Sequence, residues 1–419
     1  MRQFDVAALP RLVFAGGAIA RLAPICAERR WSRVLLIVGR SAIGDPEFRS
    51  GLERSFGESD VTIVARRYDL VPEGGRPGAS PTLDDLWQAS RGSHPEASSA
   101  VVDAIVDSVR TGVDAVVAIG GGSAIDIGKA VSAMLATEGS VEEYLEGVGT
   151  RTPPGAKVPF VAVPTTAGTG SEATKNAVLS RVGDGGYKKS LRHDAYVPDI
   201  AIVDPQLALS CPRALTAASG LDAITQLIES YVSRDASPFT DALALDGLAA
   251  AGRSFRRCVE RGDADLEARE QMAYAAYLSG ICLASAGLGT VHGLAGAAGA
   301  VAAVPHGAIC GLLLPGVTAV GIERLRRKRD SPGALSKYAS VGVALTGGPA
   351  GRPAGSLEDR LEALVRVLSE YASLSSLAPL RSYGLAQDDL TAIARAGGNK
   401  ANPYEFSVEE REQLLYRVF

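Results

Sequence analysis

Asp222 and Gln226 stand four residues apart in the segment GLDAITQLIES, at residues 220–230. On a helix this spacing places both side chains on one face. A carboxylate in that position is suited to ligate a metal cation together with a second donor one turn later. The usual second donor is an imidazole, whereas here it is a carboxamide, which binds iron or zinc more weakly. The segment therefore leaves two interpretations open: a metal site with one weak ligand, or a metal site that has lost part of its ligand set.

Two histidines lie in a stretch that carries no charged side chain. Residues 271–322 contain no Asp, Glu, Lys or Arg, and their two histidines, His292 and His306, are each followed by glycine. A single buried histidine is most often a satisfied core residue, but two of them in one apolar stretch favour a ligand role. Pro305 and Pro315 interrupt the stretch, so we interpret it as buried core helices and not as a membrane span.

A glycine-rich segment, AIGGGSAIDIGKA at 118–130, follows an apolar run and precedes a helical pattern. Glycines let the backbone approach a phosphate closely, and a helix N-terminus supplies N–H groups. Five residues separate Gly122 from Gly128, and Ala130 follows Lys129, so the segment is not a P-loop. A second loop, PTTAGTGSEAT, follows the next apolar run. Two such loops after neighbouring strands suit a nucleotide bound across the edge of a sheet.

The elements that must position these residues alternate in the first half of the chain. Apolar, β-branched runs predict strands, and helical spacing predicts the segments between them. The predicted strands are 33–38, 114–123, 158–166 and 199–205, and the predicted helices are 18–29, 99–111 and 124–135. This alternation indicates a parallel sheet covered by helices.

Beyond Pro205 the strand patterns nearly stop and helical patterns follow. We therefore expect an α/β domain at 1–205 and an all-α domain at 206–419. Residues 70–95 are rich in Gly, Pro and Ser, which is typical of a surface insertion.

Composition narrows the class of protein. The 419 residues carry a net charge of −4, so no overall basic field attracts nucleic acid or a membrane surface. The local basic run at 324–329 is interpreted as a solvated helix end. Five cysteines without a C-x-x-C pair, and an N-terminus that does not have the pattern of a signal peptide, indicate a reducing cytoplasm.

Taken together, four motifs resemble those of the iron-containing (group III) alcohol dehydrogenase family, with the maleylacetate reductase branch as a near relative. The motifs are GGGS-x-x-D-x-x-K, PTTAGTGSE, GLDA-x-T-x-x-IE and HG-x(12)-HG, and the resemblance continues to NPYEFSVEE near the C-terminus. It implies a dinucleotide-binding α/β domain followed by a helical domain, an architecture shared with dehydroquinate synthase. The metal and the substrate are then expected between the two domains, in a dimer or larger homo-oligomer.

The resemblance also implies an activity and a set of site residues. The activity is hydride transfer between NAD(P) and a small alcohol, aldehyde or ketone. The implied ligands of Fe²⁺ or Zn²⁺ are Asp222, Gln226, His292 and His306, and Asp222, His292 and His306 are also the expected catalytic residues. The residues expected to bind the nucleotide are Gly120, Gly121, Gly122, Ser123, Asp126, Thr165, Thr166, Thr169, Ser171 and Lys188.

Two positions depart from the family pattern. Gln226 replaces a ligand histidine, and Gly296 stands where many members have a second histidine four residues after the first. These departures leave three alternatives open: a metal-independent reductase of the maleylacetate reductase type, a lyase like dehydroquinate synthase, and a non-catalytic nucleotide-binding relative. The lyase would need Lys and Arg around a phosphorylated substrate, which the charge-free stretch disfavours.

The end of the strand at 33–38 bears on the choice of nucleotide. An acidic residue there binds the ribose hydroxyls of NAD and repels the 2′-phosphate of NADP. Here the strand is followed by Gly39, Arg40 and Ser41. Arg40 could form charge-assisted hydrogen bonds to a 2′-phosphate, so we expect a preference for NADP(H).

Overall fold

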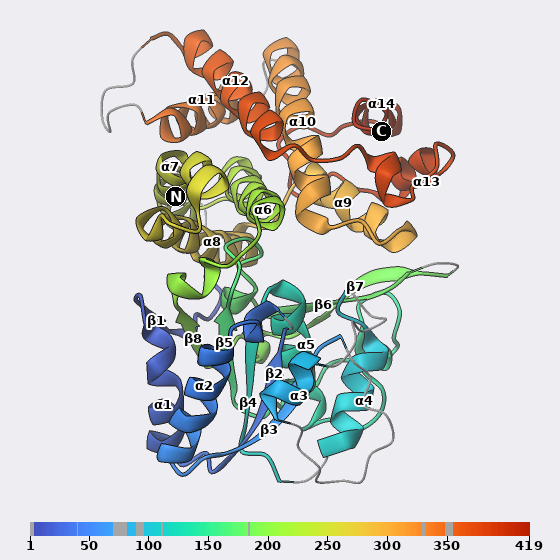
Figure 1. The fold of residues 1–419 in the computed structure, drawn as a ribbon. Coiled ribbons are helices and arrows are strands. Elements are labelled where there is room, and N and C mark those ends of the chain that lie inside the picture. The colour runs from blue at the N-terminus through green and yellow to red at the C-terminus, as the bar shows by residue number, and fades with distance from the viewer. Residues whose placement is uncertain are drawn as a thin grey trace.

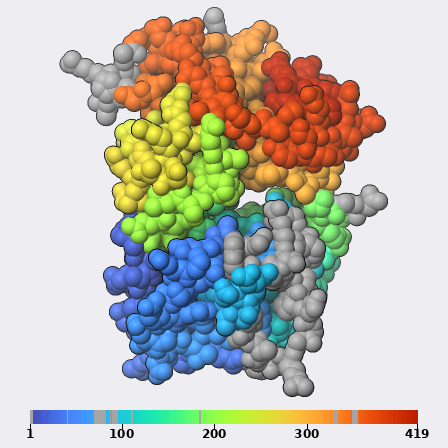
Figure 2. Space-filling view, in the orientation of Figure 1, coloured from blue at the N-terminus to red at the C-terminus, as the bar shows by residue number. Residues whose placement is uncertain are grey.

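The computed structural model describes residues 4–39, 41–69, 82–88, 96–109, 112–182, 185–328, 332–347 and 355–419. Two parts are stacked in it, a sheet covered by helices and an array of helices (Figure 1). On the face shown in Figure 2, the surface is recessed where the two parts meet.

The N-terminal part is built on a six-stranded sheet in which every pairing is parallel. Its strand order is β1-β8-β5-β4-β2-β3. The strands are β1 Arg11–Phe14, β2 Arg33–Val38, β3 Thr62–Arg67, β4 Ala115–Gly120, β5 Phe160–Pro164 and β8 Ile200–Val203. The central strands β2, β4, β5 and β8 are almost wholly buried, as expected for a sheet covered on both faces.

Helices cover both faces of this sheet. The helices are α1 Leu22–Glu28, α2 Pro46–Glu58, α3 Leu83–Gln88, α4 Ser99–Val109 and α5 Gly122–Met134. Apolar residues of α4 and α5 form the core on one face, and those of α1, α2 and α3 form the core on the other. An antiparallel hairpin of β6 Asn176–Arg181 and β7 Tyr187–Arg192 lies outside the sheet. The predicted α/β class is confirmed.

After β8, the described part of the chain contains helices and no strand. The helices are α6 Arg213–Val232, α7 Pro238–Arg261, α8 Leu266–Ala286, α9 Thr290–Val301, α10 His306–Lys328, α11 Pro332–Thr346, α12 Leu357–Ser375, α13 Asp389–Ala396 and α14 Val408–Tyr416. The change to helices comes close to the predicted boundary at 205/206. Most of the predicted insertion at 70–95 lies outside the described residues, apart from the segment that contains α3.

The charge-free stretch forms most of α8, all of α9 and most of α10. Among the described residues, α10 is a helix long and apolar enough to cross a bilayer, and 61% of its apolar window is buried inside the protein. Helices α8 and α9 pass the same test only as a pair that is bent by 96°. A long buried helix in the middle of a helical array accounts for this composition.

The two parts are in close contact through the second small-residue loop. Gly170 in that loop has a φ of +60°, and a Cβ there would lie 2.5 Å from the backbone N of Gly280 in α8. Both positions therefore require glycine. This contact fixes the loop at the carboxyl edge of the sheet against α8, a neighbour of the helix α6 that carries Asp222.

Candidate metal and nucleotide sites

Helix α6 carries two buried carboxylates on one face. Asp222 and Glu229 are 2% and 4% exposed, and their separation of seven residues is close to two helical turns. Carboxylates are almost never this buried without partners. Both of them meet the same imidazole, which belongs to His292.

Glu229 defines the start of α9 and the orientation of His292. Its carboxylate accepts hydrogen bonds from the backbone N–H groups of Gly289 and Val291 at 2.8 and 2.7 Å. It also accepts one from His292 Nδ1 at 2.7 Å. The N-cap residue, Gly289, has no side chain to cap the helix, so Glu229 satisfies these N–H groups from another helix. With Nδ1 engaged, His292 Nε2 lies 3.3 Å from Asp222 Oδ1.

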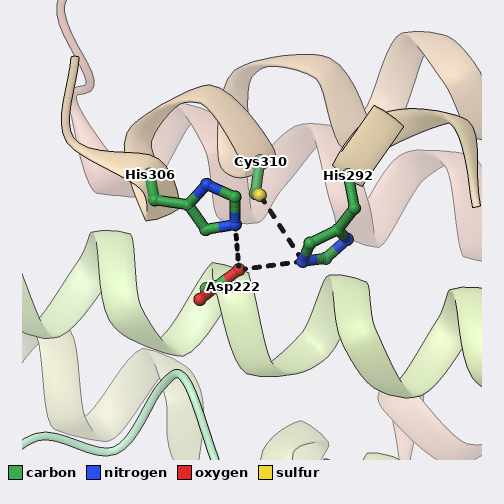
Figure 3. A group of neighbouring side chains, drawn as sticks. All are labelled: Asp222, His292, His306 and Cys310. Carbon is green, nitrogen blue, oxygen red and sulfur yellow. Dashed lines mark hydrogen bonds and ion pairs between the residues drawn. The ribbon is translucent and has the colours of Figure 1, made fainter. Parts of the chain in front are cut away.

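Helix α10 supplies two more donors to the same point. His306 is its first residue and Cys310 follows one turn later, so both face α6 (Figure 3). His306 Nε2 lies 3.9 Å from Asp222 Oδ1, and Cys310 Sγ lies 3.8 Å from His292 Nε2. One donor atom from each of the four residues Asp222, His292, His306 and Cys310 lies within 4.8 Å of the others.

The protonation states of two of these groups, His306 and Asp222, fit a cation. Burial lowers the pKa of His306 to about 3, so its imidazole is neutral and has a free lone pair. His306 Nδ1 is buried without a hydrogen-bond partner among the described residues. Burial alone would raise the pKa of Asp222, but the neighbouring His306 and His292 hold it below its usual value. A neutral imidazole and an ionised carboxylate are the forms that ligate metals.

Gln226 is engaged elsewhere. It is buried, and its Oε1 accepts a hydrogen bond from Ser279 Oγ of α8 at 2.6 Å. That oxygen is the one atom of the carboxamide that could ligate a cation. The structure therefore brings together three of the four residues expected to bind the metal, and it gives the oxygen of the fourth another partner. Sequence reasoning did not single out Cys310, although its spacing of four residues from His306 places both on one helical face.

The glycine loop lies at the carboxyl edge of the sheet, at the N-terminus of α5. Gly121 is the N-cap of that helix, and no side chain caps it. In the parallel register Gly120 pairs with Pro164 of β5, and Thr165 N donates to Gly120 O at 2.9 Å. On the other side, Gly39 N donates to Ile119 O at 2.9 Å. The ends of β2, β4 and β5 are therefore neighbours, which is the arrangement of a nucleotide site in an open α/β sheet.

Several residues expected to bind the nucleotide have protein partners. Asp126 accepts hydrogen bonds from Ser171 Oγ and from Val178 N, the latter at 3.1 Å, so it links the second loop and β6 to α5. Lys188 of β7 forms an ion pair with Glu96 at 3.1 Å. Thr165 is buried, whereas Ser123, Thr166 and Thr169 are partly exposed beside the glycine loop. Arg40 lies outside the described residues, and Ser41 begins a short 3₁₀ turn.

Lys129 reinforces the same junction. Its buried ammonium donates to Ser171 O, Thr174 Oγ1 and Asn176 O at 2.8–2.9 Å. Burial lowers the pKa of Lys129 to about 8. The lysine of the GGGS-x-x-D-x-x-K motif thus holds the second loop against α5.

A parallel α/β sheet with these two loops, joined to a helical part with a cluster of metal-ligand type, has the arrangement of a nucleotide-dependent enzyme. Comparison with known proteins gives the family. The profile of the iron-containing alcohol dehydrogenases matches residues 84–205. The profile of the C-terminal part of the Fe-containing alcohol dehydrogenase family matches residues 216–419.

Individual relatives agree. The chain is 40% identical over 386 residues to the 1,3-propanediol dehydrogenase of Klebsiella pneumoniae, covering 87% of this chain and 95% of the relative. It is 43% identical over 202 residues to long-chain-alcohol dehydrogenase 1 of Geobacillus thermodenitrificans, a match that spans 48% of this chain and only 50% of that protein. A crystal structure of 1,3-propanediol oxidoreductase superposes with a TM-score of 0.82 at 26% identity, covering 100% of both chains.

The chain therefore belongs to the iron-containing alcohol dehydrogenase family. As a member it is an oxidoreductase that transfers hydride between a nicotinamide cofactor and an alcohol or carbonyl compound.

Proposed function

We propose that this protein interconverts a small alcohol and its aldehyde or ketone with NAD(P) and one divalent metal ion, Fe²⁺ or Zn²⁺. The observation that carries the proposal is the convergence of Asp222, His292 and His306, from three different helices, on one point. Three protein ligands of this type are what catalytic metal sites use. The glycine loop at the carboxyl edge of the sheet supports the nucleotide part of the proposal.

The side chains have distinct roles in it. A bound metal supplies Lewis-acid polarisation of the substrate oxygen, and the nicotinamide gives or takes the hydride. Asp222 provides the negative charge of the ligand set, and the neutral His306 provides a lone pair. Glu229 holds His292 Nδ1 so that Nε2 faces Asp222. Asp222, His292 and Glu229 are buried, and His306 is partly exposed. Burial of the first three strengthens their interaction with a cation.

For the nucleotide, we propose that Gly120, Gly121 and Gly122 cradle the pyrophosphate at the N-terminus of α5. Ser123, Thr166 and Thr169 supply hydroxyl groups nearby. Asp126 accepts a hydrogen bond from Ser171 Oγ, so the two residues hold the second loop beside the glycine loop. The absence of a carboxylate at Gly39 supports NADP(H) as the preferred cofactor.

The test combines metal analysis with steady-state assays. Purified protein is analysed for metal and assayed with NADH and NADPH against a panel of aldehydes, ketones and alcohols, before and after treatment with a chelator. We expect activity that is lost with the metal and restored by Fe²⁺ or Zn²⁺. Asp222→Asn should abolish metal retention, while Asp235→Asn, at an exposed position, should not.

Two other outcomes would replace the proposal. Full activity after complete removal of metal would establish a metal-independent reductase. Binding of NAD(P) without turnover of any substrate would establish a non-catalytic relative.

We also infer a reducing compartment, the cytoplasm, and a homo-oligomeric state. The five cysteines are free in the structure, which suits a reducing environment. The family resemblance is the support for a dimer or larger assembly, and sedimentation of the purified protein is the measurement that tests it.

A further inference from the structure

Cys310 occupies a place in the cluster that its own helix determines. It stands one turn after His306 in α10, so its side chain lies on the same face and points toward α6 (Figure 3). It is fully buried at 0% exposure, and its Sγ lies 3.8 Å from His292 Nε2. The described residues thus contain a fourth donor beside the three that the proposed function uses.

The distances suit a common cation. In a tetrahedral site with bonds of about 2.0–2.3 Å, neighbouring ligand atoms lie roughly 3.3–3.6 Å apart. In the structure, Asp222 Oδ1 lies 3.3 Å from His292 Nε2 and 3.9 Å from His306 Nε2. The Cys310–His292 separation of 3.8 Å is only slightly longer than this spacing. Small shifts of these side chains would therefore bring Cys310 Sγ to a ligand position.

Gln226, by contrast, is turned toward a different helix. Its buried Oε1 lies 2.6 Å from Ser279 Oγ of α8, and that hydroxyl also lies 2.7 Å from Ala276 O. A carboxamide oxygen is in any case a weaker ligand for iron or zinc than an imidazole. The ligand missing from α6 is thus matched by a donor on α10.

We propose that Cys310 is the fourth ligand of the metal, replacing the imidazole that Gln226 cannot supply. This inference rests on the proposed function, because it adds a ligand to the same site. As the sulfur–metal bond forms, the thiol proton leaves to solvent, and no electron transfer is required. A donor set of one carboxylate, two imidazoles and one thiolate favours a borderline-soft ion, so Zn²⁺ should be retained in preference to Mn²⁺ or Mg²⁺.

Cobalt substitution tests the proposal with a readout that is independent of activity. Metal-free protein is titrated with Co²⁺ and its absorption spectrum recorded. We expect one Co²⁺ per chain and a near-ultraviolet sulfur-to-cobalt charge-transfer band. Cys310→Ser should lose that band and bind Co²⁺ at least about tenfold more weakly, since even changes around the ligands cost 10–100-fold in affinity. Cys282→Ser is the matched control, because Cys282 is equally buried but lies outside the cluster.

A double variant separates loss of a ligand from damage to the fold. Gln226→His in the Cys310→Ser background should recover affinity for Co²⁺ without recovering the charge-transfer band. If circular dichroism shows that Cys310→Ser does not fold, the wild-type protein can still be used to test whether Cys310 is a ligand. Bound Zn²⁺ should then protect Cys310 from alkylation, as read by mass spectrometry, and X-ray absorption at the zinc edge should show one sulfur neighbour.

The proposal is overturned if wild-type protein binds Co²⁺ without the band, if the band survives in Cys310→Ser, or if no Co²⁺ binds. If the protein turns over with a nicotinamide cofactor and its metal has no sulfur neighbour, Cys310 is not a ligand, but the proposed function stands. If the metal has a sulfur neighbour but the protein shows no turnover, Cys310 is a ligand and the proposed function fails.

Discussion

Glu229 accepts a hydrogen bond from His292 Nδ1 at 2.7 Å, and the opposite nitrogen of that ring lies 3.3 Å from Asp222 Oδ1. One imidazole thus bridges two carboxylates of the same helix. Burial opposes protonation of His292, but Cys310, Glu229 and Asp222 together raise its pKa well above the ordinary value. A carboxylate behind a ligand histidine fixes its tautomer and strengthens it as a donor.

Glu229→Gln should therefore weaken the metal site without removing a ligand. The carboxamide oxygen of the glutamine can still accept a hydrogen bond from one N–H group. The substitution removes the negative charge that polarises His292, so metal affinity should fall about 10–100-fold. Competition with a chromophoric chelator measures that affinity. Glu267→Gln is the control, because Glu267 is a surface carboxylate that is 73% exposed. Equal affinity in the two variants would show that Glu229 only caps α9.

Gly121→Val tests the nucleotide loop with little risk to the fold. A Cβ at Gly121 would lie 3.4 Å from Thr166 Oγ1, whereas a Cβ at Gly122 would lie 2.6 Å from Thr169 Cγ2. Position 121 can thus hold a side chain at ordinary contact distance, but the branched group would occupy space at the N-terminus of α5.

Loss of one hydrogen bond to a phosphate, worth about 1.5–3 kcal/mol, should raise the Kd for NAD(P)H about 10–100-fold. Fluorescence titration of the reduced cofactor measures this change. Gly57→Val is the control, because no atom lies within 4 Å of a Cβ there. An unchanged Kd for NAD(P)H in a folded Gly121→Val variant would show that the phosphates do not bind at this loop.

Much of the fold could be predicted because the buried strands leave a clear pattern. The runs at β2, β4, β5 and β8 are continuous and apolar, since both faces of the sheet are covered. Strands β1 and β3 lie at the two edges and carry arginines, and the hairpin β6–β7 is mixed in polarity. These strands are short or interrupted by charged residues, so they lack a continuous apolar run, and sequence reasoning did not predict them.

The site was predictable to the extent that residue type and spacing determine it. His292 and His306 stood out because polar groups in an apolar stretch are rare, and Asp222 stood out through its spacing of four residues from Gln226. The partner of Gln226 depends on how α6 packs against α8, and the relation of Asp126 to Ser171 depends on a contact across 45 residues. Neither contact follows from local spacing.

Glu172 should make stability depend on pH. This carboxyl belongs to the second loop and is 3% exposed, and burial raises its pKa from 4.5 to about 7. Between those two values the folded protein holds a proton that the unfolded chain has lost. The unfolding free energy should therefore fall as pH rises through this window, by roughly 3 kcal/mol for a shift of this size.

Glu172→Gln should flatten that dependence, because the amide does not ionise. Urea unfolding at pH 5 and pH 7.5 measures it, and the variant should gain stability relative to wild type at the higher pH. Parallel profiles for wild type and variant would mean that Glu172 is ionised in the folded protein throughout the window.

Gly39→Asp should change the choice of nucleotide. A Cβ at Gly39 would lie 3.6 Å from both Gly120 Cα and Tyr68 Cε1, an ordinary contact, and the φ of Gly39 lies outside the region that favours glycine. The new carboxylate would then stand at the end of β2, where it can accept from a ribose hydroxyl and repel a 2′-phosphate. Because each 1.4 kcal/mol is a factor of ten, the ratio of kcat/KM for NADPH over NADH should fall about 10–100-fold.

Gly51→Asp, in α2 with open space around its Cβ, adds the same charge elsewhere and should leave the ratio unchanged. If the wild-type protein already prefers NADH, the inferred role of Gly39, Arg40 and Ser41 is wrong. The proposals for the glycine loop and the metal cluster would still stand, because they depend on other strands and helices.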